Sequence, residues 1–543
     1  MLRGLMMDRP LLVSSLIEHA ARYHGDTEIV SRTLEGPIHR YTYRDARQRA
    51  KRVANMLTRL GMRPGDRIGT LAWNGFRHFE LYYGISGIGL VCHTINPRLF
   101  TDQIIYIVNH ASDRLLFVDL SFVPLVEKLI GDLKPVEAVV IMTDRAHMPA
   151  TSLPRALCYE ELLAAESDAL EWPEFDENTA SSLCFTSGTT GNPKGALYSH
   201  RSTLLHAMIT SLAMEMTNRD AICPIVPMFH VNAWGIPYLA PLCGNKLVMP
   251  GAALDGASLH ALFEAEGVTC TSGVPTVWLG LLRFMEENGK RFSTLKRLLV
   301  GGSAVPLAMI KAFEETHGVR AVHGWGMTEM SPVGSLVTLS GKLLELPPDQ
   351  QYELKLKQGR ALFGVDMKVV DANGNEVPQD GASRGELLVR GPWVISAYFE
   401  DAAGTAAAFD EHGWFRTGDV VTIDPQGFMQ VVDRSKDVIK SGGEWISSID
   451  IENMMMGHPD VAEAAVIGLP HPKWDERPLL VVVPKEGRRP TREAMLDFLA
   501  GRLSKWMLPD DVVFVAELPH TATGKLQKTR LREQFRDYKL PTS

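Results

Sequence analysis

The segment 182–195 constrains the fold of this chain most, because a short apolar run leads directly into a loop dense in glycine and hydroxyl residues. The run has the length and composition of a buried strand. Glycine permits positive φ and close approach to a ligand, while hydroxyl and backbone N–H groups donate to phosphate oxygens. Lys194 adds a mobile cation. The segment therefore predicts a strand that ends in a phosphate-binding loop.

The order of residues in this loop excludes a Walker A motif. Pro193 stands where the Walker A pattern requires its second glycine, and Gly195 follows the lysine where serine or threonine is needed. An ordinary surface loop is the alternative, but the order T-S-G-T-T-G-N-P-K-G favours a functional one. The candidate phosphate contacts are Thr186, Ser187, Gly188, Thr189, Thr190, Gly191 and Lys194.

The rest of the chain predicts an α/β multidomain protein. Its 543 residues exceed the ~250–300 residues at which single hydrophobic cores stop growing. Strand-like runs at 67–72, 115–119 and 139–142 alternate with helical patterns, which predicts α/β units with largely parallel sheets. One such helix is expected at 42–60, where apolar residues recur at helical spacing between a Thr-x-x-Asp cap and Gly61.

Beyond residue 385 the pattern changes to short strands and turns, which predicts an antiparallel β subdomain, and a mixed α+β pattern follows from residue 433. We therefore predict a large N-terminal domain at 1–433, made of α/β layers plus the antiparallel subdomain. A small mobile α+β C-terminal domain is predicted at 434–543, with a hinge near 433–436. The strands expected in these regions are 386–389, 420–423, 428–432 and 479–483, and a helix is expected at 492–503.

Charge and cysteine usage limit the partners. The net charge of -8 arises from 64 acidic and 56 basic residues with no long basic run, which argues against nucleic acid. The six cysteines are scattered without a C-x-x-C pair, as expected for reduced thiols in the cytoplasm. The first residues lack a signal-peptide pattern, and the most apolar window, 81–95, is shorter than the ~18 residues of a spanning helix. We expect this window to be buried core and no integral membrane segment.

Five further motifs follow the phosphate loop, and together with it they resemble the adenylate-forming superfamily, which comprises acyl-CoA synthetases, peptide-synthetase adenylation domains and luciferases. The resemblance covers nearly the whole chain and keeps the order of the family's motifs. These motifs are Gly301-Gly-Ser-Ala-Val-Pro306, His323-Gly-Trp-Gly-Met-Thr-Glu329, Arg416-Thr-Gly-Asp419, Asp433-Arg-Ser-Lys-Asp-Val-Ile-Lys-Ser-Gly-Gly-Glu444 and Thr523-Gly-Lys525.

The resemblance implies that Glu329 and Thr186 bind Mg²⁺. A carboxylate and a hydroxyl suit a hard cation that bridges the triphosphate, and Thr328 offers a second hydroxyl. Taken alone, Glu329 would be read as a solvated carboxylate at a helix start.

The nucleotide site follows from the same resemblance. Asp419 can accept hydrogen bonds from both ribose hydroxyls, and Arg434 can donate to the sugar or its phosphate. Many relatives have Tyr-Gly where this chain has Trp325-Gly326; an indole stacks on adenine equally but lacks the hydroxyl. The implied nucleotide contacts are Gly302, Ser303, Ala304, His323, Gly324, Trp325, Gly326, Met327, Thr328, Asp419 and Arg434.

Two lysines are the candidates for catalysis and domain motion. The resemblance implies that the Lys525 ammonium binds the substrate carboxylate and the α-phosphate during adenylation, and that Lys436 occupies the hinge. Rotation of the small domain would then present a different face to the acyl-adenylate. The candidate thiolation residues on that face are Lys440, Ser441, Gly442, Gly443 and Trp445.

The segment 227–238 resembles the acyl pocket of the family. In this resemblance His230 is the histidine of the aromatic-His motif, and Trp234 is a tryptophan that gates the pocket. His230 is equally well explained as a core histidine. Gly302 completes the expected substrate contacts. This segment and 441–448 resemble bacterial fatty-acyl-CoA synthetases and 3-methylmercaptopropionate:CoA ligases most.

The sequence therefore predicts an AMP-forming acid:CoA ligase that uses ATP, Mg²⁺ and coenzyme A. The leading substrate is 3-methylmercaptopropionate or another short- or medium-chain acid, and the resemblance implies a homodimer. The alternatives are a medium- or long-chain fatty-acid ligase, a stand-alone enzyme that loads a carrier protein, a non-catalytic adenylate-binding regulator and a luciferase-like oxygenase.

Overall fold

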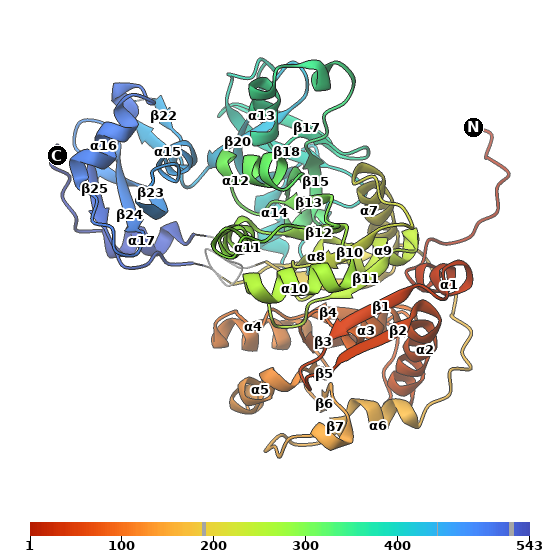
Figure 1. Cartoon of the computed structure of the whole chain (residues 1–543). Helices are drawn as coiled ribbons and strands as arrows, with labels where there is room; N and C mark the ends of the chain where they lie inside the picture. Colours follow the sequence, from red (N-terminus) through yellow and green to blue (C-terminus); the bar gives the residue numbers. More distant parts are fainter. Residues whose placement is uncertain (187–191, 443, 521–525, 543) are drawn as a thin grey trace.

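The computed structural model describes residues 1–186, 192–442, 444–520 and 526–542 (Figure 1). The strand predicted to carry the phosphate loop lies in a seven-stranded sheet of order β7-β6-β5-β3-β4-β8-β9, parallel except for the edge pair β8–β9. The strands expected at 67–72, 115–119 and 139–142 are confirmed in this sheet. Its strands are β3 (Arg67–Leu71), β4 (Val91–Thr94), β5 (Leu115–Val118), β6 (Ala138–Ile141), β7 (Ala156–Cys158), β8 (Ala180–Phe185) and β9 (Gly195–Ser199).

A second, nine-stranded sheet has the order β16-β15-β14-β13-β12-β10-β11-β1-β2. It is parallel from β14 to β1 and antiparallel at both edges. Its strands are β1 (Glu28–Arg32), β2 (Ile38–Thr42), β10 (Ala221–Pro224), β11 (Lys246–Met249), β12 (Cys270–Gly273), β13 (Arg297–Val300), β14 (Arg320–Gly326), β15 (Val333–Leu336) and β16 (Arg360–Ala361).

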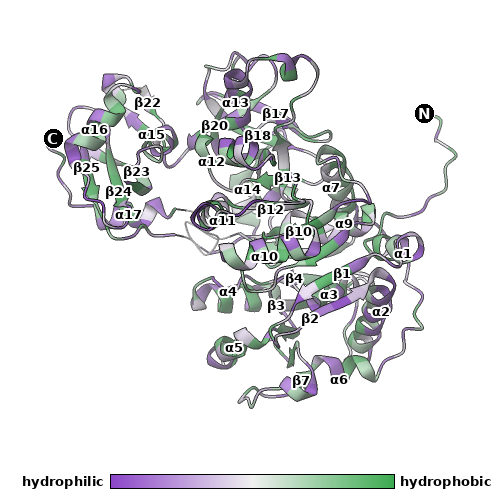
Figure 2. Ribbon diagram, in the orientation of Figure 1, coloured by the Kyte–Doolittle hydropathy of each residue, from purple (hydrophilic) through white to green (hydrophobic). Residues whose placement is uncertain are grey.

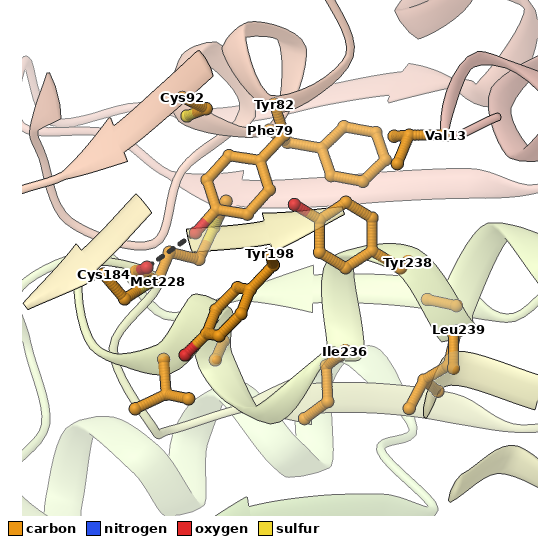
Figure 3. Close-up of a cluster of buried hydrophobic side chains, with 14 of the residues drawn as sticks. Val13, Phe79, Tyr82, Cys92, Cys184, Tyr198, Met228, Ile236, Tyr238 and Leu239 are labelled. Atoms are coloured by element: carbon orange, nitrogen blue, oxygen red, sulfur yellow. Dashed lines mark hydrogen bonds between the residues drawn. The ribbon is translucent and has the colours of Figure 1, made fainter. Parts of the chain in front are cut away.

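The two sheets share a layer of helices, and further helices cover their outer faces. The helix α3 (Phe76–Ser86) is buried along its whole length in this shared layer, where Tyr82 and Tyr238 lie side by side (Figure 3). The shared layer also contains α1 (Ser14–Tyr23), α2 (Tyr43–Arg59), α7 (His200–Ala213) and α9 (Ile236–Cys243). The outer helices are α4 (Thr101–Ala111) and α5 (Val123–Leu129) on one side and α10 (Gly256–Glu266), α11 (Pro275–Glu287) and α12 (Leu307–Lys311) on the other, with α6 (Tyr159–Ala164) and α13 (Pro348–Leu356) at the periphery.

The expected antiparallel subdomain and small C-terminal domain are both present, which confirms the predicted fold class. The chain passes from the first to the second through residues 435–438, and the strands β23 and β24 of the C-terminal sheet are largely hydrophobic (Figure 2). The antiparallel sheet contains β17 (Asp366–Val370), β18 (Gly385–Arg390), β19 (Phe415–Ile423) and β20 (Met429–Arg434), with α14 (Ala402–Ala408) beside it. The C-terminal part contains β21 (Ile439–Ser441), β22 (Glu444–Ile446), α15 (Ser448–Met455), β23 (Val461–His471), β24 (Asp475–Pro484), α16 (Arg492–Ala500), β25 (Asp511–Phe514) and α17 (Lys528–Gln534).

Two local predictions from the sequence are also confirmed. The helix α2 begins with a capping box in which Thr42 and Asp45 satisfy each other's backbone N–H groups. The window 81–95 forms the end of α3 and the strand β4 and is almost entirely buried. Within the described ranges, no helix is both long and apolar enough to cross a bilayer.

His206 on α7 is expected to make the fold sensitive to acid. It is 2% exposed, its Nε2 accepts a hydrogen bond from the backbone N–H of Val333 at 3.1 Å, and burial lowers its pKa to about 3. Below pH 6.5 the unfolded chain takes up a proton at this position and the folded chain does not, so stability falls as the pH falls. Three other buried histidines share this lowered pKa, at about 4: His78, His200 and His323.

A His206→Gln variant cannot take up that proton in either state. Between pH 6.5 and 5, its free energy of unfolding should therefore fall by about 2 kcal/mol less than that of the wild type. Urea unfolding at both pH values measures this difference. The same pH dependence in both proteins would contradict the assignment.

Candidate active site

A cavity of about 840 Å³ opens where the carboxyl ends of parallel strands of the nine-stranded sheet meet the C-terminal part of the chain. Open α/β sheets bind ligands at this edge, because the loops that follow the strands diverge there. Val226 follows β10, Val274 follows β12, Gly301 follows β13 and Met327 follows β14, and all four line the cavity. Arg434, at the end of β20, also lines the cavity. From the linker and the C-terminal part, the lining residues are Lys436, Asp437, His520, Leu526, Gln527, Lys528, Thr529, Arg530 and Glu533.

The phosphate-loop segment is the connection of the antiparallel pair β8–β9. Phe185 and Gly195 form the last residue pair of the ladder. Beyond it, the Thr186 N–H donates to Lys194 O at 2.9 Å, and the Lys194 N–H donates to Thr186 Oγ1 at 3.1 Å. These bonds close the base of the loop and place Thr186, Asn192 and Lys194 on the cavity wall. The other loop candidates lie outside the described residues: Ser187, Gly188, Thr189, Thr190 and Gly191.

Tyr398 contacts both Glu329 and Lys194. The Tyr398 hydroxyl donates to Glu329 Oε1 at 2.7 Å, and the Lys194 ammonium lies 4.8 Å from the centre of the Tyr398 ring. Burial and the neighbouring Glu329 carboxylate raise the pKa of Tyr398, so the phenol remains a hydrogen-bond donor. The backbone N–H of Phe399 donates to Gly195 O at 2.8 Å, which fixes this segment beside β9. Sequence reasoning missed Tyr398, since no local motif marks it.

The residues at this point fit a magnesium ion. Glu329 is 6% exposed, and both Glu329 and Thr186 line the cavity with hard oxygen atoms. Magnesium in phosphate sites is commonly held by one or two carboxylates, while the substrate phosphates and waters supply the other ligands. In the described part of the chain, no three His, Cys, Asp or Glu side chains converge as a preformed metal site.

Trp325 has a polar role that the sequence did not reveal. Its indole N–H donates to Asp419 Oδ2 at 2.9 Å, while the Arg434 guanidinium contacts Asp419 Oδ1 at 2.8 Å. Trp325 and Arg434 line the cavity, and Asp419 lies directly behind them with 2% exposure. The indole N–H thus orients the carboxylate that the sequence predicts to bind ribose.

The remaining nucleotide candidates divide into two groups. Gly302, Gly324, Gly326, Met327 and Thr328 line the cavity. Ser303, Ala304 and His323 do not line it, and His323 is buried with Nδ1 3.3 Å from Lys355 O.

The acyl-pocket segment contains one turn of left-handed helix, α8 (Val231–Trp234). Val231, Asn232, Ala233 and Trp234 have φ angles of 46°, 51°, 48° and 56°, and Gly235 follows at 82°. Each non-glycine residue in this conformation costs about 1–2 kcal/mol, because Cβ crowds the following carbonyl oxygen. Consecutive left-handed residues other than glycine are rare, and such strain persists only where the surroundings enforce it.

The left-handed turn places Trp234 against the glycines that follow β13. A methyl group added at Gly302 would lie 4.0 Å from Trp234 Cζ2, and one added at Gly301 would lie 3.7 Å from Cη2. Trp234 and His230 both line the cavity. Two of the predicted substrate residues, Trp234 and Gly302, are therefore neighbours, and His230 lines the same cavity.

The C-terminal candidates do not all face the cavity. Lys436 lines it, and Lys525 lies outside the described residues. His520 and Leu526, on either side of the stretch that contains Lys525, pair with each other and both line the cavity. Of the thiolation candidates, Lys440, Ser441, Gly442 and Trp445 belong to the β21–β22 hairpin and do not line the cavity, and Gly443 lies outside the described residues.

This hairpin contacts the antiparallel subdomain instead, where Arg384 Nη1 donates to Trp445 O at 2.9 Å. Within the C-terminal part, the Lys440 N–H donates to Glu476 Oε2 of β24 at 2.9 Å. The structure therefore presents the segment that flanks Lys525, and not the hairpin, to the cavity.

Known proteins match this chain along nearly its whole length. A family model described as "AMP-binding enzyme" matches residues 16–399, and one described as "AMP-binding enzyme C-terminal domain" matches residues 450–525. A 3-methylmercaptopropionyl-CoA ligase from Ruegeria lacuscaerulensis is 51% identical, over 98% of this chain and 99% of that protein. A medium-chain-fatty-acid–CoA ligase from Ectopseudomonas oleovorans is 48% identical over 99% of both chains.

The fold agrees with these matches. The crystal structure of the anthranilate CoA ligase AuaEII in complex with anthranoyl-AMP superposes with a TM-score of 0.87 and 25% identity, over 97% of this chain and 98% of that chain. The base of the phosphate loop, Glu329 and the Trp325–Asp419 pair lie at one cavity. The chain belongs to the family of AMP-binding enzymes.

Proposed function

We propose that this enzyme is an AMP-forming acid:CoA ligase that converts a carboxylate, ATP and coenzyme A into acyl-CoA, AMP and diphosphate. The observation that carries the proposal is one cavity with a phosphate-binding end, formed by Lys194, Thr186 and Glu329, and an apolar end beside Trp234. An ATP and a carboxylate that occupy these two ends would meet in between. The similarity to the CoA ligases named above supports coenzyme A as the acyl acceptor.

In the first half-reaction, a carboxylate oxygen attacks the α-phosphorus of ATP and diphosphate departs. Lys194 and the loop N–H groups would hold the outgoing phosphates, and Mg²⁺ bound by Glu329 and Thr186 would neutralise part of their charge. Lys525 would lie between the two anionic reactants and lower their repulsion. Positioning and electrostatic stabilisation are the main tasks of the protein in such a transfer.

In the second half-reaction, the thiol of coenzyme A attacks the acyl carbon and AMP departs. The β21–β22 hairpin lies away from the cavity, so rotation of the C-terminal part about 433–436 would be needed to bring Lys440 and Trp445 to it. The domain division at 433 remains a prediction.

The acid is proposed to be 3-methylmercaptopropionate or another short- or medium-chain carboxylate. Apolar residues surround the cavity end beside Trp234, among them Val274 and Val277, which suits an uncharged chain or thioether. A panel of carboxylates from acetate to long-chain fatty acids, including 3-methylmercaptopropionate, tests this by kcat/KM. Acyl-adenylate without thioester in the presence of coenzyme A would contradict the ligase and favour loading of a carrier protein.

Replacing Trp234 by alanine should shift the preference toward longer acids. The indole lies against Gly302 on the cavity wall, and each methylene of the acid that occupies the apolar space freed by its removal contributes about 0.8 kcal/mol. The kcat/KM ratio of decanoate to 3-methylmercaptopropionate should rise about tenfold or more. Trp234→Phe is the control of intermediate size, and its ratio should lie between those of the wild type and Trp234→Ala. An unchanged ratio in Trp234→Ala would mean that other residues limit the chain length.

We further propose a cytoplasmic homodimer, as the resemblance implies. The six cysteines are unpaired thiols, in keeping with a reducing compartment. Analytical ultracentrifugation at several concentrations tests the dimer.

A further inference from the structure

The left-handed turn at 231–235 requires stabilising tertiary contacts, because Val231, Ala233 and Trp234 would each be more stable in the right-handed region. Asparagine tolerates the left-handed conformation better than these neighbours do. Asn232 occupies the middle of the turn and is 3% exposed. It does not line the cavity.

The Asn232 amide contacts three buried side chains from two other elements. Its Nδ2 donates to Ser182 Oγ at 2.9 Å, and its Oδ1 accepts from Cys184 Sγ at 3.4 Å; both partners belong to β8. The Tyr82 hydroxyl of α3 lies 3.1 Å from the same Oδ1 and donates its proton to Met228 O at the shorter distance of 2.6 Å. Figure 3 shows the bond from Tyr82 to Met228, with Cys184 beside Met228.

The far end of the turn is also confined. A methyl group at Gly235 would lie 2.8 Å from His206 Nδ1, so the chain leaves the turn in direct contact with that ring. Trp234 lies between these two packed residues, Asn232 and Gly235, and lines the cavity.

These contacts connect the acyl end of the cavity to its phosphate end. The strand β8 carries Ser182 and Cys184, two of the three side chains that contact the amide, and leads directly into Thr186 at the base of the phosphate loop. A rigid amide link between β8 and the turn fixes where Trp234 lies relative to the bound phosphates.

We propose that Asn232 is a positioning residue for acid selectivity. It enforces the left-handed turn and so holds the Trp234 indole beside Gly301 and Gly302, at the boundary between acyl chain and adenylate. Asn232 acts through Trp234 and touches no substrate itself. The proposal rests on the proposed ligase function for its readout.

The test compares Asn232→Ala with the wild type in ATP- and carboxylate-dependent diphosphate release. Loss of the amide should let the turn relax and move the indole, which should change the decanoate to 3-methylmercaptopropionate ratio of kcat/KM about tenfold. The KM for ATP should stay within about twofold, because the phosphate contacts remain. Asn232→Asp keeps an acceptor and the tolerance for positive φ, so it should restore part of the ratio.

Ser182→Ala removes one partner and leaves Asn232 in place, so it should shift the ratio in the same direction by a smaller factor. This variant keeps the proposal testable if Asn232→Ala fails to fold. Asn245→Ala is the matched control. Asn245 is fully buried, its amide donates to Thr217 O, and it does not line the cavity. It should lower the melting temperature without changing the ratio.

The outcomes separate the two proposals. If the wild type turns over no acid of the panel, the ligase function fails. If the wild type is selective and Asn232→Ala or Ser182→Ala keeps its ratio within about twofold, the positioning role is overturned. A shift as large in Asn245→Ala would also overturn it, because general destabilisation would then explain the effect.

Discussion

Glu329→Gln is expected to lower the rate of acyl-adenylate formation about a thousandfold. The substitution preserves the size of the side chain and an oxygen that accepts from Tyr398, but it removes the negative charge that would hold Mg²⁺. The metal would then be bound by the triphosphate with only the Thr186 hydroxyl from the protein. Diphosphate release with ATP and a carboxylate measures the loss, and the Mg²⁺ concentration for half-maximal rate should rise.

Tyr398→Phe provides the control for this experiment. It removes the hydroxyl that lies 2.7 Å from Glu329 and keeps both the carboxylate and the ring beneath Lys194. A loss of about tenfold or less is expected, the size of one removed hydrogen bond to a charged group. If Tyr398→Phe were as damaging as Glu329→Gln, the charge of Glu329 would not be its main contribution.

Local sequence signals predicted the elements that depend on neighbouring residues. The apolar run before Thr186 and the glycine-rich loop predicted β8 and its phosphate-binding end, because strand length and turn composition are encoded within about ten residues. The capping box of Thr42 and Asp45 likewise predicted where α2 begins.

Contacts between distant segments could not be predicted in this way. Tyr398 meets Glu329 across 69 positions, and Trp325 meets Asp419 across 94. The residues involved have no local pattern that marks them as partners. The family resemblance named Trp325 and Asp419 separately, but only the structure shows that the indole orients the carboxylate.

The left-handed turn is the clearest case of tertiary control. The sequence Val-Asn-Ala-Trp contains no glycine, and nothing in it indicates positive φ at four successive residues. The conformation is enforced by Ser182, Cys184 and Tyr82, which lie 48 to 150 positions away. Local propensity is a weak guide where buried partners decide the backbone.

Lys525→Ala is expected to have the largest effect of any single change, a loss of about a thousandfold or more in adenylation. Its ammonium is proposed to neutralise charge as the carboxylate approaches the α-phosphate. Thioester formation from supplied acyl-adenylate and coenzyme A should fall by no more than about tenfold, because that step would use the other face of the C-terminal domain. The two half-reactions are measured separately, as diphosphate release and as thioester.

Variants of two other lysines in the same region test whether the result is specific to Lys525. Lys539 is exposed, so Lys539→Ala should leave both half-reactions unchanged. Lys528 is buried, and its ammonium lies 2.7 Å from Glu452 with Asp433 nearby. Lys528→Ala would leave buried carboxylates unpaired and should therefore lower the melting temperature and impair both half-reactions together. Only Lys525→Ala should separate the two steps; equal losses in both would mean that Lys525 supports the domain and does not act in adenylation.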